Sequence, residues 1–257
     1  MKIFGYIPVR MASSRLPGKP LKYILDKTML DHVYQRAKMF HKWHGLFIAG
    51  CDKEIRNFCL NKNYPYIETS KKHDRCLDRV VEATFKTKKK ISKADVVVCI
   101  QGDEPMFKPK MIKTVIDELK INKKAKASIL VMDIISKDQY LDPNIVKVVN
   151  NVNGEILYCS RSPIPFSKRF SKSLGAKRIY GIYAFRYSFL KKYNKLKMSR
   201  LEQIESCGQN RVCENIKGMY VANFKFFPSF SVDTNSDLKL VRKKMSQDVL
   251  WKKYKKF

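Results

Sequence analysis

Short apolar runs alternate with longer amphipathic stretches through the first half of the chain, and no other feature of the sequence constrains the fold as strongly. Five runs have strand length and are flanked by turn or polar residues: Ile3–Val9, Leu46–Ala49, Tyr64–Ile67, Val96–Ile100 and Ala127–Val131. Apolar residues recur with helical spacing in the intervening stretches Met29–Phe40, Lys53–Leu60, Asp74–Lys88 and Lys110–Ile121. This alternation is typical of βαβ units around a mostly parallel sheet, so we expect an α/β fold.

The pattern changes at about residue 142. Ile145–Val149 and Ile156–Cys159 resemble two strands joined by an Asn/Gly turn, and Ile179–Phe185 has the pattern of a third. We therefore predict a single domain over residues 1–257 with an inserted antiparallel lobe at about 142–186, which would serve in dimerisation. The remaining expected elements are a helix at Leu201–Asn215, a strand at Tyr220–Phe227 and a helix at Ser236–Met245.

The chain is strongly basic, with 53 Lys and Arg against 23 Asp and Glu and a formal net charge of +30. Such an excess raises the alternative of a nucleic-acid-binding protein. However, 40 of the cations are Lys and they are scattered along the chain, whereas dedicated readers of phosphates and bases rely on Arg. We interpret the charge as a Lys-rich surface and expect no nucleic-acid partner. The tail Trp251–Phe257 alternates aromatic and basic residues, and we expect a frayed, solvated helix at this chain end.

Cysteine usage and hydropathy indicate the compartment. The seven cysteines are odd in number and form no CxxC pair or zinc-like cluster, which favours free thiols and a reducing cytosol. No apolar run is long enough to span a membrane, and the N-terminus lacks a signal-peptide pattern. We therefore expect a cytoplasmic protein without membrane insertion.

The first candidate site follows the first strand, in Ile7–Leu21. Ligands of open α/β sheets bind beyond the carboxyl ends of strands. Here the cations Arg10, Arg15 and Lys19 are interspersed with small residues that let backbone N–H groups approach a polyphosphate. The alternative is a basic surface turn.

The second and third candidate sites are acidic and also follow strands. The run Val96–Ile100 leads into Gln101-Gly102-Asp103-Glu104-Pro105, where Asp103 is placed to hold a divalent cation and Glu104 to support the loop. Asp233 precedes the last predicted helix, which Asn235 or Ser236 would cap with Asp237 in its first turn. Asp103 and Asp233 together would share one metal, whereas a metal-free acidic turn is the alternative. The histidines His32, His41 and His44 lie outside these motifs and are expected on the surface or on a helix face.

Taken together, the motifs of this sequence resemble those of the 3-deoxy-manno-octulosonate (Kdo) cytidylyltransferases, also called CMP-Kdo synthetases. The resemblance extends from about residue 3 to residue 245 and rests on RMASSRLPGKPL, IQGDEP, NIVKVV with ILYCSRSPIPF, GIYAFR and VDTNSDLKLVR, in this order. It implies a nucleotide-diphospho-sugar transferase type of Rossmann-like fold and a homodimer formed through the middle lobe. The implied reaction joins CTP and a 2-keto-3-deoxy sugar acid to give the CMP-sugar and pyrophosphate, for lipopolysaccharide or surface polysaccharide synthesis.

The resemblance also implies roles for individual residues. Arg10, Arg15 and Lys19 match the cations that bind the triphosphate, with Ser14 nearby. Asp103 and Asp233 match ligands of Mg²⁺, the implied cofactor. The remaining matches concern substrate binding: Gln101, Arg161 and Gln209 around the sugar acid and nucleotide, and Arg79 near the nucleoside.

The sequence departs from the family pattern at three places, and in the family these positions lie around the sugar acid. The family's His-x-Ser-Gly-Thr-Asp/Glu-Arg loop corresponds to the stretch Lys72–Arg79 here, where Asp78 and Arg79 survive clearly. A family His becomes Ile179, and Leu-Glu-Gln-Leu-Arg becomes Cys207-Gly208-Gln209-Asn210-Arg211. The departures suggest an altered sugar acid, amino-substituted or longer, although neutral divergence with Kdo retained is the alternative. A sugar 1-phosphate nucleotidyltransferase of the same fold is a further alternative.

Overall fold

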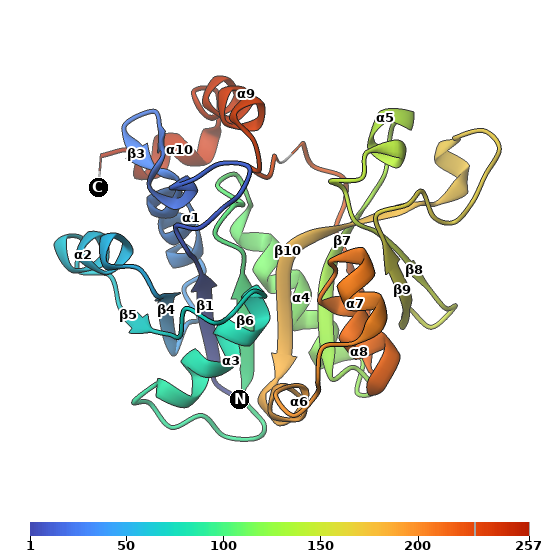
Figure 1. Cartoon of the computed structure of the whole chain (residues 1–257), viewed down its shortest axis with the longest axis horizontal. Coiled ribbons are helices and arrows are strands. Elements are labelled where there is room, and N and C mark those ends of the chain that lie inside the picture. The colour runs from blue at the N-terminus through green and yellow to red at the C-terminus, as the bar shows by residue number, and fades with distance from the viewer. Residues whose placement is uncertain (229, 257) are drawn as a thin grey trace. The chain divides into compact units, whose positions relative to one another are not determined.

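The chain forms two compact units, which are described one at a time. The first comprises residues 1–112 and 228–257, and the second comprises residues 113–227. The structure is a computed structural model that describes residues 1–228 and 230–256 (Figure 1). Helix α4 (Pro109–Ile121) contains the boundary between the units.

The first unit contains four parallel strands in the order β6-β1-β4-β5 (Figure 1). Their bounds are β1 Ile3–Pro8, β4 Gly45–Gly50, β5 Tyr66–Glu68 and β6 Val96–Ile100. Every residue of β1 and β6 is buried, which explains why both strands are continuous apolar runs in the sequence. Because Tyr6 of β1 pairs with Cys99 of β6, the loops that follow these strands leave the same edge of the sheet.

Helices pack against these strands. Those of the first unit are α1 Met29–Lys38, α2 Lys53–Asn61, α3 Cys76–Lys86, α9 Asn235–Met245 and α10 Val249–Tyr254. Helix α3 contacts β1, β4 and β5, whereas α1 and α2 contact β4. A short 3₁₀ helix (Lys19–Leu21) and the two-residue strands β2 (Tyr23–Ile24) and β3 (Lys27–Thr28), none of which the sequence predicted, lead from the basic loop into α1.

The second unit mixes parallel and antiparallel pairing. Its strands are β7 Ala127–Asp133, β8 Lys147–Asn150, β9 Ile156–Ser160, β10 Lys177–Arg186 and β11 Met219–Asn223. Strand β11 is parallel to β7, whereas β10 is antiparallel to both β7 and β8, and β8 pairs with β9 in a hairpin. The helices are α5 Lys137–Leu141, α6 Tyr187–Tyr193, α7 Arg200–Glu205 and α8 Gln209–Asn215, with a 3₁₀ turn at Lys172–Leu174. Parallel strands with flanking helices and an antiparallel set at β8–β10 confirm the predicted fold class.

Several predicted elements need correction. The single helix expected at Leu201–Asn215 is two helices, because Ser206 adopts a left-handed φ of 50° that ends α7. The strand expected at Tyr220–Phe227 ends at Asn223. The cap of α9 is Thr234 rather than Asn235 or Ser236, and it forms a capping box with Asp237.

The tail and His32 lie in helices, as expected, but Trp251 and Tyr254 of the tail and His32 are buried and not solvated. The tail forms helix α10, whose Trp251 and Tyr254 are 5% and 2% exposed, although Phe257 lies outside the described residues. His32 is fully buried: its ring nitrogens bond to the Tyr254 hydroxyl and the Ile24 carbonyl at 2.7 Å each, and burial lowers the pKa of His32 to about 4. His41 and His44 are exposed, as expected.

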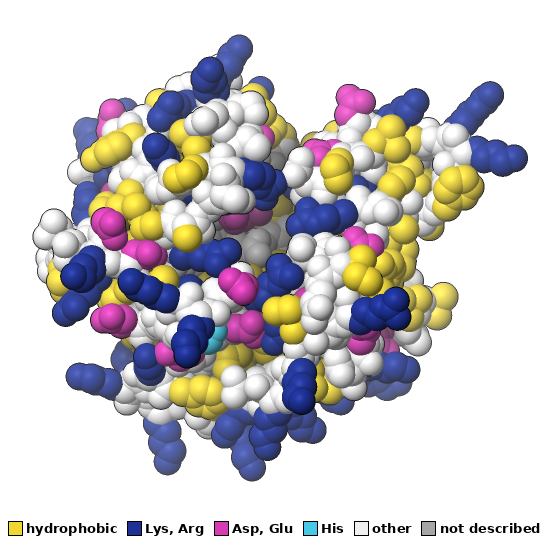
Figure 2. Space-filling view, viewed as in Figure 1, with side chains coloured by type: hydrophobic (Ala, Val, Ile, Leu, Met, Phe, Trp, Pro, Cys, Tyr) yellow, Lys and Arg dark blue, Asp and Glu magenta, His cyan; other side chains and the backbone are white. Residues whose placement is uncertain are grey.

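All seven cysteines are free thiols, in agreement with their odd number and spacing. Among the helices of residues 1–228 and 230–256, each is too short or too polar to traverse a bilayer. Lys and Arg side chains are spread over the visible face and are not gathered in one stripe (Figure 2), which agrees with the interpretation of a Lys-rich surface.

Candidate active site

The basic loop after β1 is folded back on itself and anchored at several points. The Met11 amide donates to Asp52 Oδ2 at 2.9 Å, and the Gly18 amide donates to the Met11 carbonyl at 3.1 Å. Gly18 has a φ of 70°, a left-handed conformation that glycine adopts without strain. The Leu16 side chain is buried in a cluster with residues of α9 and α10. These anchors hold the exposed residues Ser14 and Arg15 at the surface of the loop.

Lys19 lies between the two predicted metal ligands. Its ammonium is 2.9 Å from Asp103 Oδ2 and 3.1 Å from Asp233 Oδ1, with 13% of the side chain exposed. Burial alone would lower the pKa of Lys19, but the two carboxylates outweigh it and raise the pKa above its usual value. Arg15 NH2 also contacts Asp233 Oδ1, at 3.1 Å. Arg15 and Lys19 therefore form one charge cluster with the two predicted metal ligands.

The loop that carries Asp103 is fixed against β1 and against the segment before α9. A Cβ atom at Gly102 would lie 2.4 Å from Val9 Cγ1, so only glycine allows this close approach. The Asp103 carbonyl accepts the Val232 amide at 2.9 Å, which couples this loop to the segment carrying Asp233. Glu104 is 3% exposed and its Oε1 accepts the Ser231 hydroxyl at 2.7 Å. These contacts agree with the predicted role of Glu104, which is to support the loop.

Asp233 is oriented by the cap of α9. Asp237 Oδ2 accepts the Asp233 and Thr234 amides at 3.0 and 2.8 Å, and the Thr234 hydroxyl accepts the Asp237 amide at 3.2 Å. The backbone of Asp233 is thereby fixed, and its carboxylate is directed to Arg15 and Lys19.

Arg10 meets a second loop, residues 69–75. Its NH1 donates to the His73 carbonyl at 3.4 Å and lies 3.6 Å from Asp74 Oδ1. Glu82 of α3 is hydrogen-bonded to this loop. Its Oε2 accepts the Ser70 amide at 2.8 Å and bonds to His73 Nε2. His73 was not among the predicted site residues, because its partner Glu82 is visible only once α3 is folded against the loop.

Arg79 and Gln101 face inward in the first unit. Arg79 is 2% exposed and its NH1 donates to the Thr69 hydroxyl and to the Ser70 carbonyl, so its contacts brace the loop. Gln101 Nε2 donates to Cys76 Sγ at 3.4 Å. Hydrogen bonds from Cys99 and Gln101 lower the pKa of Cys76, which stands at the first position of α3.

Arg161 and Gln209 belong to the second unit, and each is anchored there. Arg161 donates through Nε to the Glu205 carbonyl and through NH1 to the Pro143 carbonyl, at 2.9 and 2.8 Å. The Glu205 carboxylate accepts the Arg161 amide at 2.8 Å. Gln209 Nε2 donates to the Tyr183 hydroxyl at 2.9 Å. The assignment of these two residues to the substrate pocket stays a prediction.

A buried lysine supports Arg161. Lys147 has no exposed surface, and its ammonium donates to the carbonyls of Asp142, Ile145 and Arg161 at 2.6, 2.9 and 2.8 Å. Burial lowers the pKa of Lys147. Sequence reasoning missed this residue, because its position in an apolar strand gives no sign that its charge is satisfied by three carbonyl groups.

The acidic residues near Lys19 fit a Mg²⁺ ion. Asp103 Oδ1 is buried without a hydrogen-bond partner among the described atoms, and Asp233 contributes a second carboxylate beside it. Mg²⁺ is commonly held by one or two carboxylates together with water and substrate phosphates. No cluster of three or more His, Cys, Asp or Glu side chains suited to a metal occurs in the described part of the chain, so phosphate oxygens would have to complete the shell.

Comparison with known proteins gives consistent results. Residues 5–219 match the family model described as Cytidylyltransferase. A 3-deoxy-manno-octulosonate cytidylyltransferase of Thermodesulfovibrio yellowstonii is 39% identical over 246 residues, covering 92% of this chain and 95% of that protein. The enzyme of the same name from Nitrosococcus oceani is 36% identical and covers 92% and 93%.

Solved structures agree with this result. The structure of a CMP:2-keto-3-deoxy-manno-octonic acid synthetase complexed with CTP matches with a TM-score of 0.84 and 34% identity, covering 96% of this chain and 99% of that one. A cytidylyltransferase from Leptospira borgpetersenii matches with a TM-score of 0.63 at 17% identity over 97% of this chain and 88% of that one, which shows a shared fold.

Proposed function

The chain belongs to the 3-deoxy-manno-octulosonate cytidylyltransferase family, and we propose that it transfers CMP from CTP to a 2-keto-3-deoxy sugar acid with release of pyrophosphate. One observation in the structure supports this proposal most directly. Lys19 lies between Asp103 and Asp233, while Arg10 and Arg15 stand on the same loop beyond a buried parallel strand. This arrangement supplies cations for a triphosphate and carboxylates for a divalent cation at one edge of a sheet.

The cations of the loop would bind and orient the triphosphate. Arg10 and Arg15 have about half of their side-chain surface exposed, so they can reach a ligand, whereas Lys19 is nearly buried and held in place. Positioned ammonium and guanidinium groups stabilise charge that develops on phosphoryl oxygens without reorganisation at the moment of reaction. The oxygen of the anomeric hydroxyl attacks the α-phosphorus in line and forms the new P–O bond, while its proton passes to solvent. The bond between the α-phosphorus and the oxygen that bridges to the β-phosphorus breaks, and pyrophosphate leaves.

Asp103 and Asp233 are the residues that would hold Mg²⁺. When bound, this ion neutralises charge on the phosphate oxygens of the nucleotide. The cap of α9 fixes Asp233 and the Val232 amide fixes the loop of Asp103, so both carboxylates are positioned by backbone contacts that do not depend on the ion.

Arg161 and Gln209 would bind the sugar acid, and Arg79 with Gln101 would shape the nucleotide side of the pocket. Of these four residues, only Arg161 has the following set of contacts. Its side chain donates two hydrogen bonds to backbone carbonyls, and its backbone amide donates one to the Glu205 carboxylate. Such bonds fix the direction of the guanidinium group, which pairs well with a carboxylate such as that of an ulosonic acid. We propose Kdo as the substrate, with related ulosonic acids as the competitors that the assay must include.

We further propose that the protein acts in the cytoplasm as a homodimer, in the supply of activated sugar for lipopolysaccharide or surface polysaccharide. The seven free thiols support a reducing compartment. Sedimentation equilibrium of the purified chain tests the dimer.

The proposed reaction is tested by pyrophosphate release from CTP and Mg²⁺ with a panel containing Kdo, an amino-substituted Kdo and a longer ulosonic acid. We expect release with at least one of them and no release with sugar 1-phosphates. Asp103→Asn should lower kcat by about 10²-fold or more, as for loss of other groups that stabilise developing charge. The control Asp117→Asn changes an exposed helical ion pair and should leave kcat unchanged. Absence of release with the whole panel, or full activity of Asp103→Asn, would contradict the proposal.

A further inference from the structure

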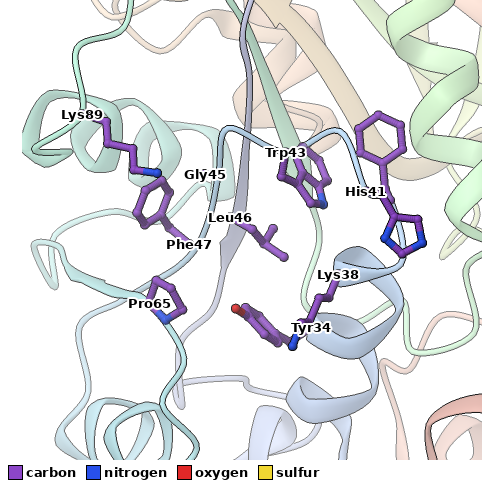
Figure 3. A pocket seen from close by; sticks show the side chains of 10 residues that line it. Tyr34, Lys38, His41, Trp43, Gly45, Leu46, Phe47, Pro65 and Lys89 are labelled. Carbon is purple, nitrogen blue, oxygen red and sulfur yellow. The ribbon is translucent and has the colours of Figure 1, made fainter.

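A pocket of about 440 Å³ lies in the first unit at the amino-terminal ends of β1 and β4, where no predicted site residue is found (Figure 3). Gly45 and Leu46, which line it, pair with Phe4 and Gly5 of β1. The catalytic loop, in contrast, follows the carboxyl end of β1. Since a parallel strand rises about 3.3 Å per residue, Phe4 and Arg10 are roughly 20 Å apart along the strand direction. The pocket is therefore separate from the candidate active site.

The walls of the pocket are aromatic and are held rigidly. Trp43 Nε1 donates to the Ala37 carbonyl at 2.7 Å, and the indole lies against Gly5, where a Cβ atom would be only 2.9 Å from the ring. Tyr34 stacks on Tyr64 with a centroid distance of 3.8 Å. Packed rings of this kind lose little further freedom when a ligand binds.

Phe47 forms another wall and is also fixed, because it stacks on Tyr6 of β1 with a centroid distance of 5.5 Å. Figure 3 shows Trp43 and Phe47 on either side of Leu46, with Tyr34 and Pro65 closing the space below in this view. Tyr34 is 7% exposed, so the partly exposed rings of Trp43 and Phe47 are the aromatic groups that a ligand in the pocket would contact.

The rim of the pocket is cationic. Lys38 and Lys89 are among the ten lining residues, and none of the ten carries a carboxylate. In Figure 3 the Lys89 side chain lies beside Phe47, and the Lys38 side chain lies beside Tyr34. The Lys89 ammonium donates to the His44 carbonyl at 2.6 Å, which directs the side chain. The exposed residues Lys42, Lys88 and Lys90 add further positive charge in the adjacent chain segments.

We propose that this pocket binds a nucleoside phosphate, with the base against Trp43 and Phe47 and the phosphate groups at the cationic rim, where Lys38 and Lys89 lie. The volume lies within the range of small-molecule sites, about 300 to 1,000 Å³. Stacking on an aromatic side chain tolerates any base, since each has a π face. An inorganic anion would leave the rings unused, and an apolar ligand would leave the two ammonium groups without an anionic partner.

The two tryptophans of the chain make the test direct. In the full-length Trp251→Phe variant, Trp43 is the remaining tryptophan and reports on the pocket. We expect saturable quenching of its fluorescence by CTP, CMP, ATP and GTP, and none by inorganic phosphate. The double variant Lys38→Glu/Lys89→Glu should weaken the binding at least about tenfold, a loss expected from two reversed charges. Lys123→Glu, which reverses an exposed charge in the second unit, is the matched control and should bind as the parent does.

The CTP and CMP arms show whether a triphosphate is needed for binding. The variant Lys19→Met distinguishes the pocket from the catalytic site, because this variant should retain the quenching. Quenching that survives the double variant, or that is lost in Lys19→Met, would show that nucleotides bind at the catalytic site alone and would overturn the proposal. Quenching by a single-stranded oligonucleotide but by no mononucleotide would also overturn it. Calorimetric titration of the unmodified chain with CTP provides a second measurement, with two sites expected and one in the double variant. The binding readout does not depend on catalysis, so its failure is distinct from failure of the proposed reaction.

Discussion

The contribution of the Glu82 carboxylate to the free energy of unfolding can be predicted quantitatively. It lies on α3 beneath the loop that contacts Arg10, and 21% of its side chain is exposed. Oε2 accepts the Ser70 amide and bonds to His73, whereas Oε1 accepts the Lys86 ammonium at 2.6 Å. The substitution Glu82→Gln removes the charge and keeps the shape of the side chain.

The magnitude follows from the pKa. Partial burial alone would raise the pKa of Glu82, but the hydrogen bonds from Lys86, the Ser70 amide and His73 outweigh it and lower the pKa from 4.5 to about 2. At 1.36 kcal/mol per pKa unit, the charged form contributes about 3 kcal/mol to the free energy of unfolding. Because the folded-state pKa is depressed, this contribution is fully present above pH 4.5 and is lost as the pH falls through about 2.

The assay is urea denaturation of the natural chain and Glu82→Gln between pH 7 and pH 3. We expect a difference in unfolding free energy of about 3 kcal/mol at pH 7 that falls to less than half at pH 3. Glu68→Gln is the matched control, since its ion pair with Arg56 is exposed and such pairs contribute about 1 kcal/mol or less. A difference for Glu82→Gln that is independent of pH, or equal to the control, would refute the assigned network. The same variant should raise KM for CTP, since the loop that contacts Arg10 loses its support.

Two further predictions concern Lys19 and Arg36. Lys19→Met should lower kcat by about 10²- to 10³-fold because the ammonium proposed to bind the triphosphate is lost. The exposed neighbour Lys22 provides the control, and Lys22→Met should retain kcat in the same pyrophosphate assay. Asp248→Ala should reduce the unfolding free energy measured in urea by about 3 to 5 kcal/mol, because the fully buried Arg36 loses its carboxylate partner at 2.9 Å; a loss below about 1 kcal/mol would show that this pair behaves as a surface pair.

The sequence predicted well those features that depend on neighbouring residues. Buried parallel strands are continuous apolar runs, so β1 and β6 could be located within a residue or two, and the loops after them carried the catalytic candidates. It failed where a contact joins distant segments. His32 and Tyr254 are 222 positions apart, and neither the tail nor the histidine reveals its partner locally. The meeting of Asp103 and Asp233 above the basic loop was predicted although they lie 84 and 214 positions from Lys19, because strand ends at one edge of a sheet show which loops come together.

The departures from the family pattern in the second unit are not equivalent. Asn210 replaces a family leucine, and its side-chain amide bonds to both the amide and the carbonyl of Cys159, at 3.1 and 2.9 Å. A leucine makes neither bond, so this change comes with its own structural compensation and is a poor indicator of substrate. Gly208 replaces a family glutamate, and a Cβ atom there would meet only Glu202 Oε1 at 3.9 Å. The Glu202 carboxylate therefore lies near the point where the family's glutamate side chain would begin. Within the second unit, the argument for a changed sugar-acid preference rests on Gly208 and Ile179, not on the whole altered stretch.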